Sequence, residues 1–483
     1  MKPRFQQHPQ RLPGTGRFSP ARLRVVSSGL VLLLLSNSPP GRCEYVEKDD
    51  KNAHATTEPV LKPGTQSVFA PGPGEYPYYG NAPADMLPYR NIEPFYRYWL
   101  TRLPFRGPGK DYPDPTNLTS LRVGLLNPPP YGLESKRGEM SRKGVVLAFE
   151  EANASRAGKP PFELVEKADS PQWGSAANIA VEFADKDVLG FIGTIDGDAT
   201  HVALRVALKI ETCMINCSDP DPTLTETQIP WLLRIFPDNR QQGYGLASLI
   251  VKERGLKKIV VLRANSRPGR VGVRPFVDAV RRLGYPVLQE INFKDGDRQF
   301  NTQVSVIKQA DPDAVVFWGN PSETAPAAVQ LRAAGVKAGF YGFDRLVSPE
   351  FVRLAGAAAE DTTATYFFDP QKSDPAWAGF RQRFQARFGA EPDIYAGYGY
   401  DAGKLMIEAI VKAGPNKYRV HDQLTSLDEY TGVTGHMRFD GRWDNIAPVV
   451  TARCKDGSWH FDSPNTQQAS GQSPLGNPVV STP

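Results

Sequence analysis

From residue 121 onward, short apolar runs alternate with amphipathic segments. Such runs stand at 121–126, 162–169, 188–193 and 213–216. They are either mainly apolar or alternate between apolar and polar residues, which is typical of strands in a sheet with a buried face. Helical spacing of apolar positions follows at 141–154 and 173–185 and, more weakly, at 201–209. We expect residues 127–140 to form a loop between the first strand and the first helix. Strands and helices that alternate with short loops predict a parallel sheet covered on both faces, the α/β class.

A second alternating set begins after residue 231. Strands are expected at 257–265, 313–319 and 362–368, and helices at 273–284, 323–335 and 376–389. A long helix is expected over 395–414, followed by a closing hairpin over 435–461. Two such sets, with the chain crossing between them more than once, predict two Rossmann-like lobes with parallel sheets, joined by a hinge of several strands.

Two small polar loops follow neighbouring strands in the first set. TIDGDAT comes after the strand at 188–193, and SDPDPTLTE comes after the strand at 213–216. Parallel strands end at the same edge of a sheet, and open α/β sheets bind ligands at that edge. The candidate binding residues in these loops are Asp196, Gly197, Asp198, Ser218, Asp219 and Pro220.

The amino-terminal segment has the composition of an export signal. The first 24 residues carry six basic and no acidic side chains, and an apolar stretch at 25–35 follows that is short for a membrane span. We therefore expect residues 1–43 to be a signal peptide or an amino-terminal anchor. The net charge of +5 owes much to this segment, and no basic cluster interleaved with aromatic residues points to nucleic acid.

Residues 44–119 are rich in proline, glycine and tyrosine, which predicts an extended arm on the surface. Within it, 95–103 has the pattern of a short amphipathic helix, which we expect to dock on the main body. Residues 464–483 are expected to form a disordered tail. Cys213 and Cys217 lie too far apart along an extended strand for a disulfide, so we expect two half-buried thiols.

At this point the chain resembles a known family. The segments RKGVVLAFEEANA, FIGTIDGDAT, CMINCSDPDPTLTE, LLRIFPDNRQQGYGLA, FYGFD, YAGYGYDAGKLMIEAI and GVTGHMRFDGRWDN occur in an order similar to that of type I periplasmic binding proteins, in the Leu/Ile/Val-binding branch. The resemblance covers about 121–461. It implies one lobe from 120–238 plus 365–430 and a second from 239–364 plus 431–463.

The resemblance also implies a function: an exported, extracytoplasmic receptor that closes two lobes on a small solute for an ABC-type importer. Its partners would be a small ligand and a membrane permease, with no cofactor, no nucleic acid, and the membrane reached only through the amino terminus. In amino-acid binders of this family the first loop takes the ligand carboxylate at a helix start, and an acid of the distal lobe takes the ammonium group. The matching acid here is Asp344. The alternative is a periplasmic sensory or redox-linked module whose amino-terminal arm docks a partner protein.

The first lobe departs from the family pattern, because aspartates stand where amino-acid binders have serine, threonine and small residues. Three interpretations stay open. Asp198 caps the helix near His201 and Asp219 holds a turn; the acids face a cationic ligand such as a diamine or a peptide amine; or they bind a metal ion such as Ca²⁺.

The family resemblance implies that further candidate residues border the same cleft. Trp318 and Asn320 end a strand, where the indole either stacks on a ligand or completes the core. Arg267 and Arg270 lie in a loop that either faces solvent or clamps an acid group. Tyr131 is a further ligand candidate. The chain has no GxSxG, HExxH or P-loop motif, so we expect no enzyme.

Overall fold

The computed structural model describes residues 107–172, 174–227 and 229–462. The predicted signal at 1–43, most of the predicted arm and the tail at 464–483 lie outside these residues. Among the described residues, no helix has the length and apolar character needed to cross a membrane.

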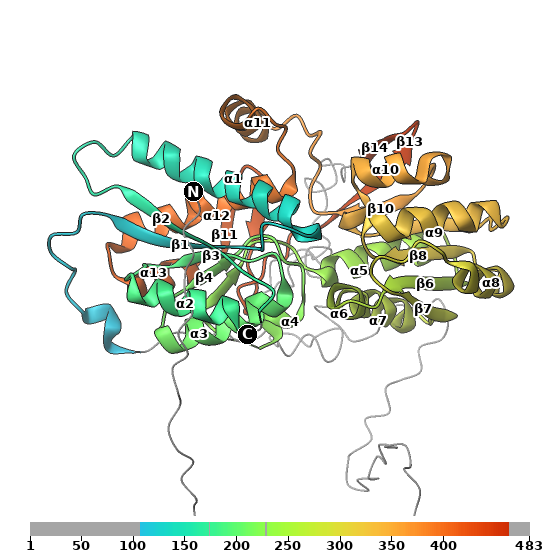
Figure 1. Cartoon of the computed structure of the whole chain (residues 1–483), viewed down its shortest axis with the longest axis horizontal. Coiled ribbons are helices and arrows are strands. Elements are labelled where there is room, and N and C mark those ends of the chain that lie inside the picture. The colour runs from blue at the N-terminus through green and yellow to red at the C-terminus, as the bar shows by residue number, and fades with distance from the viewer. Residues whose placement is uncertain (1–106, 173, 228, 463–483) are drawn as a thin grey trace, which may run out of the picture. The chain divides into compact units, whose positions relative to one another are not determined.

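Within the described residues, the first sheet has five parallel strands in the order β2-β1-β3-β4-β5 (Figure 1). Their bounds are β1 Leu121–Asn127, β2 Phe162–Ala168, β3 Phe191–Gly193, β4 Met214–Asn216 and β5 Leu232–Arg234. The helices that follow them along the chain are α1 Leu133–Ala154, α2 Ser175–Asp185, α3 Gly197–Ile210 and α4 Thr223–Glu226. We call this sheet with the helices packed on it lobe 1.

The second sheet, within the same described residues, has seven strands in the order β14-β13-β10-β9-β8-β6-β7, in which β13 pairs antiparallel with both β10 and β14. The bounds of these strands are β6 Ile259–Ala264, β7 Gln289–Phe293, β8 Ala314–Trp318, β9 Gly339–Gly342, β10 Thr363–Tyr366, β13 Val450–Lys455 and β14 Ser458–Asp462. The helices packed on this sheet are α5 Asn239–Ala247, α6 Arg267–Gly272, α7 Arg274–Arg282, α8 Asn301–Ala310, α9 Pro321–Ala333 and α10 Pro349–Ala355, and a π-helical segment spans Ser248–Glu253. We call this part lobe 2.

After β10 the chain returns to lobe 1 with three more helices and a hairpin. These are α11 Pro375–Phe388, α12 Ile394–Ala413, α13 Lys417–Thr425, β11 Glu429–Gly432 and β12 Gly435–Arg438. In Figure 1, α1 and α12 lie on one face of the first sheet and α2 and α3 on the other. The predicted two-lobed α/β architecture is therefore confirmed.

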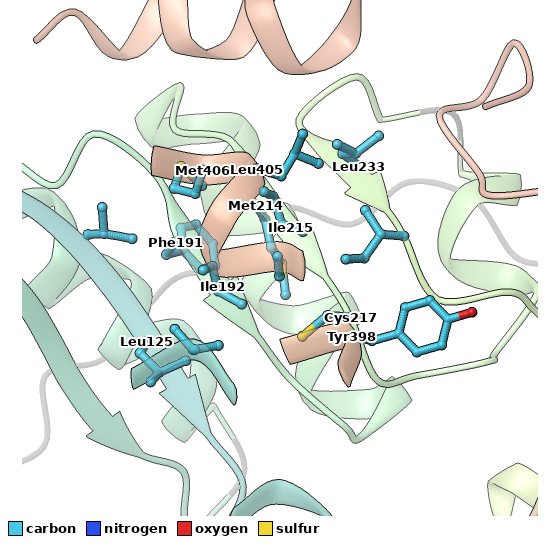
Figure 2. Close-up of a cluster of buried hydrophobic side chains, with 14 of the residues drawn as sticks. Leu125, Phe191, Ile192, Met214, Ile215, Cys217, Leu233, Tyr398, Leu405 and Met406 are labelled. Carbon is cyan, nitrogen blue, oxygen red and sulfur yellow. The ribbon is translucent and has the colours of Figure 1, made fainter. Parts of the chain in front are cut away.

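Each sheet has its own apolar core. In lobe 1, Phe191, Ile192, Met214 and Ile215 are fully buried against Met406 of α12 (Figure 2). The core of lobe 2 is built by β6 and β8 with α7 and α9. The alternation of buried strands with one-sided helices, which is visible in the sequence, is what builds both layers.

Helix α1 and helix α12 approach closely because glycines face the contact. A Cβ on Gly144 would lie 2.0 Å from the carbonyl oxygen of Ala396, and one on Gly399 would lie 2.2 Å from that of Ser141. Any larger residue would force the two helices apart. The glycines of YAGYGYDAG thus have a packing role.

The prediction of a loop over 127–140 was wrong beyond residue 132. Helix α1 begins at residue 133, two turns earlier than expected. The early turns are polar and carry Glu134 and Arg137, so they lack the apolar spacing that marks the rest of the helix. Their side chains are used at the cleft instead, as described below.

Candidate functional site

A small cavity of about 50 Å³ lies where the carboxyl ends of both sheets meet. Both lobes contribute to its wall. The lining residues are Glu134, Ile195, Asp196, Gly197, Asp198, Asp219, Pro220, Asp221, Asn239, Arg267, Pro268, Val271, Gly272, Phe343 and Arg345. The sheet edge predicted from the sequence thus forms one wall of this cavity.

The lobe 1 wall begins with the first turn of α3. Asp196 is the N-cap of this helix, and its Oδ1 accepts hydrogen bonds from the backbone N–H groups of Asp198 at 2.8 Å and Ala199 at 3.1 Å. The prediction that Asp198 caps the helix was wrong by two residues. Two of the donors that a helix start offers to an anion are therefore already bound to a carboxylate of the protein.

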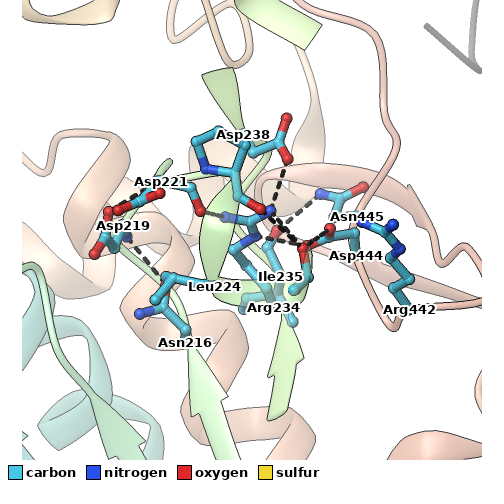
Figure 3. A network of polar contacts seen from close by, with 12 residues as sticks. Asn216, Asp219, Asp221, Leu224, Arg234, Ile235, Asp238, Arg442, Asp444 and Asn445 are labelled. Carbon is cyan, nitrogen blue, oxygen red and sulfur yellow. Dashed lines mark hydrogen bonds and ion pairs between the residues drawn. The ribbon is translucent and has the colours of Figure 1, made fainter. Parts of the chain in front are cut away.

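The second acidic loop is held against the first by Asn216. Its side-chain nitrogen donates to the carbonyl oxygen of Thr194 at 2.9 Å, and its oxygen accepts from the backbone of Ser218 at 3.3 Å and Asp219 at 3.0 Å (Figure 3). Asn216 is fully buried at the end of β4. This bridge fixes the position of Asp219 relative to the start of α3.

Asp219 is the most unusual group in the wall. Its side chain is buried, its Oδ1 accepts from the backbone of Asp221 at 2.9 Å, and its Oδ2 has no hydrogen-bond partner among the described residues. The turn that we expected Asp219 to hold is thus present. Burial raises the pKa of Asp219 well above its usual value, and the neighbouring carboxyl group of Asp221 raises it further.

Arg267 enters the cavity from lobe 2, at the start of α6. It donates from Nε to Asp221 Oδ2 at 3.0 Å and from Nη2 to Thr223 Oγ1 at 3.0 Å, and its Nη1 lies 3.3 Å from Asp198 Oδ1. All three nitrogens of this guanidinium group thus face lobe 1. The guanidinium group thus binds side chains of lobe 1, and its predicted role as a clamp for an acid group of a ligand stays a prediction.

Arg345 makes the second connection between the lobes. Its Nη1 donates to Glu134 Oε1 at 3.0 Å and to Asn320 Oδ1 at 2.8 Å. Arg137 of α1 also approaches Asn320 Oδ1, at 3.4 Å, and pairs with Glu134 at 3.0 Å. Burial alone would raise the pKa of Glu134, but the guanidinium groups of Arg345 and Arg137 outweigh it and hold the pKa below its usual value.

The structure brings together only part of the predicted site. Asp196, Gly197, Asp198, Asp219 and Pro220 line the cavity. Asn320 does not line it but contacts Arg345, which does.

The other candidates lie elsewhere. Ser218 is buried behind the loop, whereas Tyr131 and Arg270 are exposed and do not line the cavity. Trp318 is fully buried and stacks on Phe343 with ring centroids 4.4 Å apart, so the indole supports the wall from behind.

Asp344 lies next to the cavity without lining it. Its Oδ1 accepts from Gln242 Nε2 at 2.9 Å, its backbone N–H donates to Gln242 Oε1 at 2.9 Å, and the hydroxyl of Tyr395 lies 3.4 Å from Oδ2. Burial raises the pKa of Asp344. A side chain with both oxygens engaged inside the protein contrasts with Asp219, which keeps one oxygen unused.

A larger hollow of about 1160 Å³ adjoins the small cavity and shares Asp196, Asp198, Arg267 and Val271 with it. His201 also lines this outer space, and its Nε2 lies 2.8 Å from Thr223 Oγ1. The described residues hold no group of three or more His, Cys, Asp or Glu side chains arranged to bind a metal ion. The small cavity between the acidic loops is thus polar, and the larger hollow lies beside it.

The lining residues that the sequence analysis missed are Glu134, Ile195, Asp221, Asn239, Pro268, Val271, Gly272, Phe343 and Arg345. The same edge rule would have pointed to Glu134, since it follows β1, a third strand that ends at this edge. Arg345 directly follows the acid chosen from the family pattern, so its position was within one residue of the prediction. No signal in the sequence indicates that Phe343 faces the cavity.

The comparisons with known proteins agree with this architecture. The family model for periplasmic binding proteins matches residues 120–458. A Leu/Ile/Val-binding protein homolog from Brucella abortus is 25% identical over 353 residues, which are 72% of this chain and 94% of the relative. A leucine-, isoleucine-, valine-, threonine- and alanine-binding protein from Pseudomonas aeruginosa is 24% identical over 72% of this chain and 92% of its own length.

Solved structures give the same result. The crystal structure of a leucine-binding protein from Thermotoga maritima superposes with a TM-score of 0.64 at 25% identity, covering 71% of this chain and 98% of that one. Together with the two-lobed fold and the cavity between its sheets, these matches show that the chain belongs to the periplasmic binding protein family.

Proposed function

We propose that this protein is an exported solute-binding receptor, which closes its two lobes on a small ligand and presents the closed form to the membrane permease of an ABC-type importer. The observation that carries the proposal is the cavity whose wall combines both acidic loops of lobe 1 with Arg267 and Arg345 of lobe 2. A ligand held by both walls favours the closed arrangement, because its contacts with one lobe are lost when the lobes separate.

The names of the relatives support this role. The Brucella and Pseudomonas proteins are named as binding proteins for amino acids, and the Thermotoga protein is named as a leucine-binding protein. The extracytoplasmic location and the permease belong to the same proposal. An enzymatic role has no comparable support among these relatives.

The first test is a thermal-shift screen of the full chain against amino acids, amines, short acids, aromatic compounds and divalent ions. A ligand that binds only the native state raises the unfolding midpoint, by an amount that grows with ligand concentration. Small-angle X-ray scattering with and without a hit should show a smaller radius of gyration with ligand. A screen in which no class of compound shifts the midpoint would contradict the receptor role.

The second test addresses the importer. Cells of the source organism that lack this chain should take up the identified ligand more slowly, and the wild-type gene should restore uptake. Normal uptake without the chain would separate ligand binding from import and favour a sensory role.

A further inference from the structure

The charges that line the small cavity are unbalanced. Five carboxyl groups, those of Glu134, Asp196, Asp198, Asp219 and Asp221, face two guanidinium groups. Glu134 is paired with Arg345, while Asp221 and Asp198 share Arg267. The excess is therefore acidic, and neither arginine forms a close ion pair with Asp196 or Asp219.

Asp196 has its own compensation, because its carboxylate caps α3 and accepts from two backbone N–H groups. Asp219 has less. It pairs with no Lys, Arg or His side chain of the described residues, and its Oδ2 is buried without a hydrogen-bond partner. Keeping a buried carboxylate oxygen without a partner is costly, so such an atom in a cavity wall points to a group that arrives from outside.

Asp219 and Gly197 line the cavity beside the helix start. A Cβ on Gly197 would lie 2.7 Å from Asp221 Oδ2 and 3.2 Å from both Arg267 Nε and Asp219 Oδ2. Any side chain at residue 197 would crowd these atoms. The glycine thus lets both acidic loops and Arg267 approach one another at this wall.

An anionic ligand group does not fit at this place. The backbone N–H groups of Asp198 and Ala199, which a bound carboxylate would need, already donate to Asp196. Asp219 and Asp221 would repel a second negative charge at the same loop.

We propose that the small cavity binds a small organic amine in its ammonium form, with Asp219 as its counter-ion. The inference rests on the proposed solute-binding function and specifies the ligand class. The ammonium group donates to Asp219 Oδ2, and the carbon skeleton extends past Val271 towards the adjoining larger hollow, because a cavity of about 50 Å³ holds only the charged end. Charge-assisted hydrogen bonds of this kind are stronger than neutral ones.

The test uses matched ligands that share one carbon skeleton. L-Leucine carries both an amino and a carboxyl group, 3-methylbutylamine lacks the carboxyl group, and 4-methylpentanoate lacks the amino group. Calorimetric titration of the full chain in phosphate buffer, free of amine buffers, should show binding of 3-methylbutylamine at least tenfold tighter than that of 4-methylpentanoate. Methylamine, butane-1,4-diamine and 2-phenylethylamine extend the series in size and charge.

The variant Asp219→Asn should weaken the best amine at least tenfold, because the side chain keeps its shape and loses its charge. Asp311→Asn is the control, since Asp311 is an exposed acid at the end of α8, away from the cavity. The unfolding midpoint of Asp219→Asn without ligand should equal or exceed that of the wild type. Lost binding with an unchanged midpoint then excludes misfolding as the cause.

Three results would overturn the inference: 4-methylpentanoate binding as tightly as 3-methylbutylamine, the best amine keeping its affinity in Asp219→Asn, or every amine failing while an acid or a neutral solute binds. In each of these cases a ligand still binds, so the receptor function survives. If no compound of any class binds, the proposed function itself fails.

Discussion

Replacing Arg234 with methionine removes the charge around which the crossover between the lobes is organised. The guanidinium group is fully buried and donates to Asp444 Oδ1 at 2.6 Å and to Asp238 Oδ2 at 2.7 Å (Figure 3). It also donates to the backbone carbonyl of Asp221. Methionine keeps a long, unbranched, apolar side chain, so the substitution tests the charge more than the packing.

We expect the variant to lose about 3 kcal/mol of unfolding free energy. Removing one partner of a buried ion pair costs about 3–5 kcal/mol, because the remaining charge is left without compensation. Arg240 stays 2.6 Å from Asp444 and also pairs with Asp238, which places the expected loss at the lower end. In a chain of this length 1 kcal/mol lowers the midpoint by roughly 1–2 °C, so a decrease of roughly 3–6 °C should accompany it.

Urea unfolding followed by tryptophan fluorescence measures the difference. Arg453→Met is the matched control, because Arg453 pairs with Asp361 at 2.7 Å on the surface, and such a pair contributes about 0.5 kcal/mol. The double variant Arg234→Met with Asp444→Asn should be more stable than Arg234→Met alone, since it removes one of the two acids. The reasoning is refuted if Arg234→Met costs no more than the control, or if the second substitution makes the protein less stable.

Three further predictions concern other parts of the molecule. Phe236→Ala should lower the unfolding free energy in urea by about 3–5 kcal/mol, because this ring is fully buried and its centroid lies 4.3 Å from that of Phe367 and 4.9 Å from that of Tyr398. A loss under about 1 kcal/mol would contradict the place of Phe236 in the core. Burial raises the pKa of Asp393 to about 6, so the native state holds this proton to higher pH than the unfolded chain does. The stabilisation from this group is therefore present below about pH 4 and is lost as the pH rises towards 6. Between about pH 4 and 7 the unfolding free energy of Asp393→Asn should rise by on the order of 2 kcal/mol relative to that of the wild type. If the unfolding free energies of the two proteins ran parallel over this pH range, the prediction would be refuted. Burial raises the pKa of Cys213 to about 12 and that of Cys217 to about 11, so iodoacetamide should label neither thiol before unfolding, as mass spectrometry would show.

The fold was predictable because its signals are local and repeated. Each strand of the first sheet is a short apolar run, and each of the helices over residues 141–154 and 175–185 has one apolar face, so periodicity alone separates the two. The expected and observed bounds differ most at the start of α1, where polar residues serve the cleft. The half-buried thiols expected at Cys213 and Cys217 are in fact fully buried, because β4 has a neighbouring strand on each side and α12 against it.

The candidate site was predictable only in part. The rule that open α/β sheets bind ligands at the carboxyl ends of their strands identifies the loops, but it does not tell which way the side chains of these loops point. Asp196 and Asp198 are two residues apart, and local preference allows either to cap the helix. Only the three-dimensional structure shows that Asp196 takes this role and leaves Asp198 to Arg267. Likewise, the lack of a hydrogen-bond partner for Asp219 Oδ2 in the described part of the chain depends on the whole surrounding wall, which no pattern within one loop encodes.

The loop that holds Asp219 is also part of the crossover between the lobes. Its Pro220 carbonyl accepts from the backbone of Asn239, the first residue of α5 in lobe 2, at 2.9 Å, and its Asp221 carbonyl accepts from Arg234. Arg234 in turn holds Asp238, which caps α5, and Asp444 on the returning segment. A ligand that pairs with Asp219 therefore acts on a loop whose backbone is bonded to the hinge. Under the proposed receptor function, binding and lobe closure share this loop, so Arg234→Met should change ligand affinity in calorimetric titration although Arg234 does not line the cavity.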